Sequence, residues 1–141
     1  MKIFIGSDHA GYDLKEQIKQ HFKDGIEWID LGTNSTASVD YPNFAHPVAQ
    51  AVAENPDNTG ILICGTGNGM AMTANKHPNI RAALCWSKEI AALARQHNNA
   101  NILVLPARFI SSETAFEMIE TFLSTPFEGG RHLNRINKIN L

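Results

Sequence analysis

The sequence predicts an α/β fold in which a parallel sheet of five strands is covered by helices on both faces. Short apolar runs alternate along the chain with segments of helical periodicity, and this alternation is typical of such a sheet. Ile61, Leu62 and Ile63 form a continuous apolar run, as expected of a strand buried on both faces. That run leads directly into the glycine loop of residues 65–69, and α/β proteins place their ligand sites above strand ends of this kind. These observations favour a three-layer α/β/α, Rossmann-like fold.

The expected strands are separated by segments with helical patterns. The five strands are expected at residues 2–7, 26–31, 60–64, 80–85 and 101–105. After the first strand, Leu14, Ile18 and Phe22 recur every four residues, which predicts a helix with one apolar stripe. The charged side chains of this helix are expected to face water: Lys15, Glu16, Lys19 and Lys23.

The later helices are predicted from residues that favour the start of a helix. These are Pro42 for a second helix, Ser87 for one that runs to about Asn98, and Ser111 or Ser112 for one that runs through Leu123. Pro126 and the pair Gly129-Gly130 then precede a last helical segment. The loop of residues 32–40 is polar and longer than most, so we expect it to border the site.

Length and composition indicate a single domain, residues 1–141, without a general affinity for nucleic acid or membrane. A chain of 141 residues with 43% hydrophobic content can bury a core without disulfides or metals. With 12 basic and 14 acidic residues the net charge is −2, so any anion site must be local. No stretch approaches the ~20 apolar residues of a membrane helix, and no export signal is visible. Cys64 and Cys85 fit no zinc motif and indicate reduced thiols in a cytoplasmic protein.

Polar and reactive side chains follow the ends of several expected strands. In a parallel sheet these ends meet along one edge, and ligands bind in the crevice above it. Some of the candidates follow a strand directly, and others lie in or near connections that can reach the same crevice. The residues expected to line it are Asp8, His9, Tyr41, Cys64, Thr66, His97, Asn98 and Arg108.

Cys64 stands where the third strand meets the glycine loop. A helix that starts at this loop would present free N–H groups and its dipole to the strand end, which favours an anion and the thiolate form of Cys64. A cysteine at the end of a buried strand is, however, more often an inert core residue. Thr66 and its neighbouring N–H groups suit a developing oxyanion as well as a simple turn. The loop matches neither a phosphate-binding loop ending in Gly-Lys-Ser/Thr nor a full dinucleotide fingerprint.

The remaining candidates also have two interpretations. Asp8-His9 can be a turn with a cap for the first helix, and His97 can be a cation at a helix end. Arg131 and Arg135 are four positions apart, so on a helix they share a face and can hold a phosphate together with His9. Otherwise they form a solvated basic surface. Arg108 is either a further phosphate ligand or an exposed surface arginine.

Six motifs in order along the chain resemble those of a known family. They are Gly6-Ser-Asp-His-Ala-Gly11, Asp40-Tyr-Pro42, Gly60-Ile-Leu-Ile-Cys-Gly-Thr-Gly67, Ala74-Asn-Lys76, Arg95-Gln-His-Asn98 and Gly129-Gly-Arg-His-x-x-Arg135. Together they identify the chain as similar to the ribose- and galactose-6-phosphate isomerases. The resemblance is to the members that act on ribose 5-phosphate and use a cysteine base, because Met70 stands where a second subtype has a glutamate.

The resemblance implies a reaction and a role for each candidate. The family interconverts ribose 5-phosphate and ribulose 5-phosphate through a cis-enediolate, without metal or other cofactor, in the non-oxidative pentose phosphate pathway. Cys64 would move the proton between C2 and C1, and His97, assisted by Asp8, would open the sugar ring. The implied binding residues are Tyr41 and Asn98 for substrate hydroxyls, Thr66 with Gly65, Gly67 and Gly69 for the enediolate oxygen, and His9, Arg108, Arg131 and Arg135 for the phosphate.

The resemblance also implies a homodimer, sometimes paired into a tetramer, in which each site contains residues of both subunits. We expect the C-terminal segment, residues 129–141, to contribute to the dimer and to the phosphate site. Two alternatives remain open from the sequence. One is a related isomerase that acts on galactose 6-phosphate or allose 6-phosphate, and the other is a non-catalytic phosphosugar- or nucleotide-binding module in which Cys64 is structural.

Overall fold

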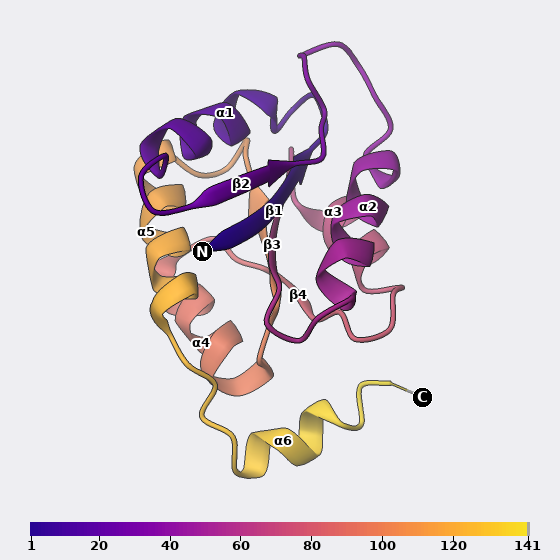
Figure 1. Cartoon of the computed structure of the whole chain (residues 1–141), viewed down its shortest axis with the longest axis vertical. Helices are drawn as coiled ribbons and strands as arrows, with labels where there is room; N and C mark the ends of the chain where they lie inside the picture. The colour runs from indigo at the N-terminus through magenta and orange to yellow at the C-terminus, as the bar shows by residue number, and fades with distance from the viewer. Residues whose placement is uncertain (141) are drawn as a thin grey trace.

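The computed structural model describes residues 1–140, which form a three-layer α/β/α fold (Figure 1). A single sheet forms the middle layer. Its strands are β1 (Lys2–Ser7), β2 (Glu27–Asp30), β3 (Thr59–Cys64), β4 (Ala82–Leu84) and β5 (Ile102–Pro106). They lie in the order β2-β1-β3-β5-β4, and all neighbouring pairs are parallel. The predicted fold class and the five predicted strands are therefore confirmed, with strand ends that shift by up to two residues.

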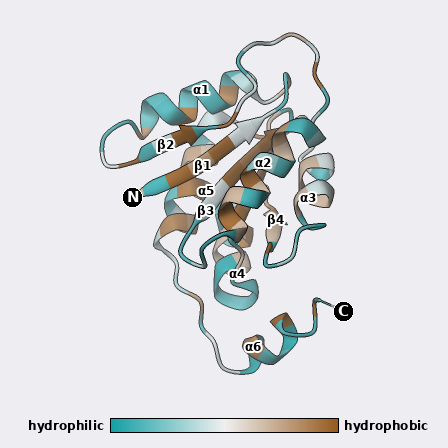
Figure 2. Cartoon of the chain, turned by 45° about the vertical axis from the view of Figure 1, so that its right-hand side comes forward, coloured by the Kyte–Doolittle hydropathy of each residue, from teal (hydrophilic) through white to brown (hydrophobic). Residues whose placement is uncertain are grey.

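Helices cover both faces of the sheet. They are α1 (Tyr12–His21), α2 (Pro42–Ala53), α3 (Asn68–Ala74), α4 (Lys88–Asn98), α5 (Ser112–Ser124) and α6 (Arg131–Ile136). One core cluster joins the sheet to α1, α4 and α5, and a second joins it to α2 and α3. Hydrophobic residues concentrate on the strands between these two helical layers (Figure 2). Helix α6 lies apart from the layers, next to α4 (Figure 1).

Most predicted helix starts are confirmed by their local geometry. Pro42 is the first residue of α2, where its missing N–H has no helical partner to lose. The Ser87 side chain accepts a hydrogen bond from the Ile90 N–H, and that of Ser111 accepts one from the Thr114 N–H. These two caps satisfy amide groups that the first turn of a helix leaves free.

The expectation that the charged side chains of α1 all face water is wrong for Lys15. Its side chain is fully buried, and its Nζ lies 2.6 Å from Asp30 Oδ2 at the end of β2. Lys19 contacts the same carboxylate at 2.6 Å. Lys15 can be buried because its attraction to the nearby Asp30 carboxylate offsets much of the free-energy cost of removing its charge from water. Sequence periodicity could not reveal a partner that is 15 positions away.

The direction of the strands defines two opposite edges of the sheet. At the carboxyl edge lie the turn after β1, the glycine loop after β3 and the turn after β5. At the amino edge lies the end of α4, because only three residues separate Asn98 from the start of β5. The five residues of β5 separate the two edges by about 15 Å at a rise of roughly 3.3 Å per residue. In the described residues, 1–140, no helix combines the length and the apolar character that a membrane crossing requires.

Candidate active site

Cys64 ends β3 and is wrapped by the glycine loop. Its side chain is buried, and its Sγ accepts a hydrogen bond of 3.2 Å from the Gly67 N–H. Gly67 has a φ of 80°, in the left-handed region, and a Cβ there would lie 2.4 Å from Leu84 Cδ1. Glycine at this position is therefore required by both conformation and space. Helix α3 begins at Asn68, which fulfils the condition that a helix start at this loop, and the first N–H groups of a helix have no acceptor within it.

The glycines of the loop also allow two side chains to approach it closely. A Cβ at Gly65 would lie 3.1 Å from a terminal nitrogen of Arg108, and one at Gly69 would lie 2.4 Å from the Tyr41 ring. The Arg108 N–H donates to the Gly65 carbonyl at 3.0 Å, which fixes the turn after β5 against the loop. Thr66 is exposed at the tip of the loop, and its Oγ1 accepts from the Asn68 N–H.

Asp8 and His9 lie beside Cys64 because β1 and β3 are neighbours. Ser7 pairs with Ile63 in the sheet, and the Asp8 N–H donates to the Ile63 carbonyl at 3.2 Å. The Asp8 carboxylate accepts from the N–H groups of Ala10 and Gly11, so the turn in the alternative interpretation is present. The cap position of α1 is Gly11, which has no side-chain cap hydrogen bond. His9 Nδ1 accepts from the Val39 N–H at 3.2 Å, so the long loop borders the site as expected.

These residues form what we call the carboxyl-edge cluster. It contains Asp8, His9, Tyr41, Cys64, Thr66 and Arg108, together with the glycine loop of residues 65–69. The cluster joins a thiol, loop amide groups and an arginine around one strand end. Its chemistry suits a base that acts next to a developing oxyanion.

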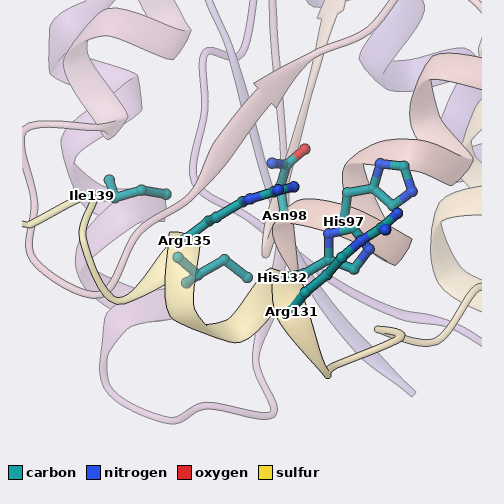
Figure 3. A pocket seen from close by; sticks show the side chains of 7 residues that line it. His97, Asn98, Arg131, His132, Arg135 and Ile139 are labelled. Carbon is teal, nitrogen blue, oxygen red and sulfur yellow. The ribbon is translucent and has the colours of Figure 1, made fainter.

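A second group of predicted residues lines a pocket of 360 Å³ at the amino edge (Figure 3). We call this the amino-edge pocket. It is lined by His97, Asn98, Arg131, His132, Arg135, Ile136 and Ile139. Arg131 and Arg135 are both exposed on α6 and both line the pocket, in agreement with their predicted common face. Two guanidinium groups beside a histidine and an amide can hold a phosphate.

The expectation that His97 and Asn98 reach the crevice above the strand ends is wrong within a single chain. Both residues lie in the last turn of α4, which runs back across the sheet before β5 begins. They therefore lie at the opposite edge from Cys64. The predicted helix does end at Asn98, but a helix between two parallel strands runs opposite to them, which places its end at the amino edge.

His132 and Glu128 are residues whose roles the sequence reasoning missed. His132 is the buried residue of α6, at 6% exposure, and its ring stacks on that of His97 with a centroid distance of 4.4 Å and an interplanar angle of 16°. Its Nε2 lies 3.5 Å from a carboxylate oxygen of Glu128. The spacing of four between Glu128 and His132 was the available signal, although α6 begins only after Glu128.

His97, Glu128 and His132 also form a group of possible metal ligands in residues 1–140, with ligand atoms within 4.8 Å of one another. The lone pairs of imidazole nitrogens lie in the ring plane. Because the two rings are stacked nearly parallel, their lone pairs lie in two separate, nearly parallel planes and do not converge on one ion. The observed geometry therefore suits a histidine stack better than a metal centre.

The second cysteine provides an internal contrast. Cys85 is fully buried after β4, and burial raises the pKa of its thiol to about 12. It therefore stays protonated at neutral pH and is a core residue. Both cysteines are free thiols, as predicted.

The chain is similar to known proteins over nearly its whole length. The family model described as Ribose/Galactose Isomerase matches residues 3–139. The ribose-5-phosphate isomerase B of Escherichia coli is 44% identical over 139 residues, which are 98% of this chain and 93% of that protein.

Two solved structures have nearly the same backbone. A ribose 5-phosphate isomerase from Thermotoga maritima has a TM-score of 0.95 and 56% identity, and covers 99% of this chain and 97% of its own. The ribose-5-phosphate isomerase B of Mycoplasma genitalium, solved with bound ribulose-5-phosphate, has a TM-score of 0.94 and 50% identity. That match covers 98% of this chain and 93% of the other.

Proposed function

The chain belongs to the ribose/galactose isomerase family, and on that premise we propose that it interconverts D-ribose 5-phosphate and D-ribulose 5-phosphate. The observation that carries the proposal is the Cys64 thiol held at 3.2 Å by the Gly67 amide of the glycine loop. The relatives named ribose-5-phosphate isomerase B, one of them solved with ribulose-5-phosphate, support the choice of substrate. Two free thiols are consistent with a reducing compartment, so the proposal places the enzyme in the cytoplasm.

In the proposed reaction Cys64 is the base. Its thiolate removes the proton from C2 of the open-chain aldose, and the electron pair shifts to form the cis-enediolate with its charge on O1. The hydroxyl proton then moves from O2 to O1, and the thiol returns the carbon-bound proton at C1 to give the ketose. The Gly67 N–H already donates to Sγ and holds the sulfur at the end of β3. Thr66 and the remaining amides of the loop, including Gly65 and Gly69, stabilise the enediolate oxygen, each at roughly 3 kcal/mol when well placed.

The other residues bind and prepare the sugar. His97 transfers the proton that opens the ring, assisted by Asp8, while Tyr41 and Asn98 bind hydroxyl groups. His9, Arg108, Arg131 and Arg135 bind the phosphate. Each of these roles is carried over from the family onto the matching position in this chain. None of them requires a metal ion, so we expect full activity in the presence of a chelator.

The proposal requires two copies of the chain for each site. Cys64 and His97 act on the same small substrate, yet one chain holds them at opposite edges of the sheet. Thr66 and Arg108 are exposed at one edge, and Arg131 and Arg135 at the other. A homodimer that brings the amino-edge pocket of one subunit onto the carboxyl-edge cluster of the next completes the constellation, and this arrangement also permits a tetramer built from dimers.

Mixing two inactive variants tests the composite site. Cys64→Ala and His97→Ala are expected to be nearly inactive alone. If subunits exchange at a 1:1 ratio, half of the dimers are mixed and each has one intact site, so activity should return to about a quarter of the native value. Light scattering gives the oligomeric state of each preparation. Absence of recovery in dimers shown to have exchanged would contradict sharing of the site.

The function itself is tested by isomerisation of ribose 5-phosphate in a chelator, for the native protein and for Cys64→Ala. Turnover that the variant loses supports the thiol base. If the native protein turns over only galactose 6-phosphate or allose 6-phosphate, the substrate assignment is wrong. Binding of phosphosugars without turnover would instead indicate a non-catalytic module.

A further inference from the structure

His132 has an unusual position for a polar residue. Helix α6 is short and its arginines are exposed, yet the one residue that it buries is an imidazole rather than an aliphatic side chain. Burial of a polar ring is unfavourable unless the ring gains specific contacts. The contacts of His132 are the face of His97 and the carboxylate of Glu128.

The stack fixes the orientation of His97. A histidine in the last turn of a helix can rotate about two side-chain bonds. The His132 ring lies against one face of the His97 ring at 4.4 Å and 16°. Contact with a face leaves the edge nitrogens of His97, a residue that lines the pocket, uncovered by the His132 ring. Both side chains are drawn in Figure 3.

The same short helix carries Arg131 and Arg135 into the pocket. The His97–His132 stack therefore joins the ring-opening histidine to the phosphate-binding arginines in one unit. Glu128 extends the unit, because its carboxylate is 3.5 Å from His132 Nε2, and its backbone N–H donates to the Gln96 carbonyl on α4 at 3.1 Å.

We propose that His132 is a positioning residue for ring opening: it serves as a flat platform that holds the His97 imidazole in its productive orientation, with Glu128 holding the platform. This inference rests on the proposed isomerase function and assigns a role that the family resemblance did not supply. A misplaced catalytic group can lower a rate by about 100-fold even for a shift of ~1 Å.

Ring opening can be measured separately from proton transfer. Isomerisation of ribose 5-phosphate requires both steps. Exchange of the C1 hydrogen of ribulose 5-phosphate with D₂O requires Cys64 and the enediolate but no ring opening, because this ketose is an open chain. A residue that acts through His97 should affect the first assay and spare the second.

The test compares His132→Ala with His132→Phe. We expect His132→Ala to lower kcat for ribose 5-phosphate by about 30-fold to 100-fold, with KM and C1 exchange within about threefold of native. His132→Phe retains a flat ring and should recover most of the activity. His97→Ala provides the reference phenotype, and Asn134→Ala, an exposed position on the same helix, is the matched control.

Three outcomes would overturn the inference. A native kcat in His132→Ala would show that no platform is needed. A parallel loss of exchange and isomerisation with a raised KM would show that His132 only anchors α6 and its arginines. Equal defects in His132→Phe and His132→Ala would exclude stacking as the cause. Failure of the isomerase assignment is distinct, since the native protein would then show neither reaction.

Discussion

Each edge of the sheet supplies one part of the proposed site, and the two parts are built differently. The carboxyl-edge cluster is fixed by main chain, since the Gly67 amide, the Asp8 turn and the turn after β5 all bond to backbone or to Cys64. The amino-edge pocket is formed by side chains on the end of α4 and on α6, a helix of six residues outside the three layers. Charge that develops at one oxygen needs preorganised donors. A phosphate can be bound by long, adaptable arginine side chains.

The largest expected effect separates the two cysteines. Cys64→Ala should lower kcat by about 10³-fold, since removal of a general base typically costs about 10²-fold to 10⁴-fold. Cys85→Ala should leave kcat unchanged and lower the free energy of unfolding by about 1 kcal/mol through lost packing. Steady-state kinetics and urea denaturation of both variants give the comparison. Equal loss of activity in the two would remove the distinction between an active and a core thiol.

At the amino edge, removal of an arginine should weaken mainly the binding of the substrate phosphate. Arg135→Ala removes a charge-assisted contact to the phosphate, worth roughly 1.5–3 kcal/mol, so kcat/KM should fall about 10-fold to 150-fold with most of the change in KM. Lys138→Ala is the matched control, because this exposed cation on the same segment does not line the pocket. Similar values of KM for Arg135→Ala and the native protein would show that this edge does not bind phosphate.

A smaller effect is expected where the loop meets Tyr41. In Gly69→Ala the new methyl group would lie 2.4 Å from the ring, so Tyr41, which is 40% exposed, must swing away. Loss of one hydroxyl contact should lower kcat/KM about 10-fold. The free energy of unfolding should stay unchanged or rise by up to ~1 kcal/mol, because alanine has a higher helix propensity than glycine. Met72→Ala, exposed on the same helix, should change neither quantity.

The smallest expected effect is on the free energy of unfolding, through the ion pairs of Asp30 at the carboxyl end of β2. Burial opposes ionisation of Asp30, but hydrogen bonds from Lys15, Lys19 and the Gly32 N–H outweigh it and hold the pKa of Asp30 below its ordinary value of 3.8. Ionised Asp30 therefore raises the free energy of unfolding at pH values above 3.8. This contribution is lost as the pH falls through the lower pKa that Asp30 has in the folded protein. Its window therefore lies below about pH 4.

Denaturation curves between pH 7 and pH 2 measure this contribution. Allowing for solvent screening of a partly exposed pair, we expect Asp30→Asn to lower the free energy of unfolding by about 1 kcal/mol at pH 7 and to flatten the acid dependence. Activity per folded molecule should hardly change, because Asp30 lies outside both groups of site residues. An unchanged acid dependence would show that Asp30 does not anchor α1 to β2.

Local patterns in the sequence were sufficient for the elements of the fold. Apolar runs such as Ile61–Ile63 identify buried strands, and Pro42, Ser87 and Ser111 mark helix starts, because their effects depend on residues a few positions away. The glycine loop and its cysteine were recognised for the same reason. The motifs also identified the family, which the comparisons confirmed.

Contacts between distant segments were decided only by the tertiary structure. The periodicity of α1 predicts that Lys15 is exposed, but its side chain is buried against Asp30. His97 was expected in the crevice above the carboxyl ends of the strands, but α4 runs back across the sheet and places His97 at the opposite edge. His132 lies 35 positions from His97, and only the packing of α6 on α4 stacks their rings. Sequence periodicity reports the environment along one element, whereas these pairings depend on how separate elements pack in space.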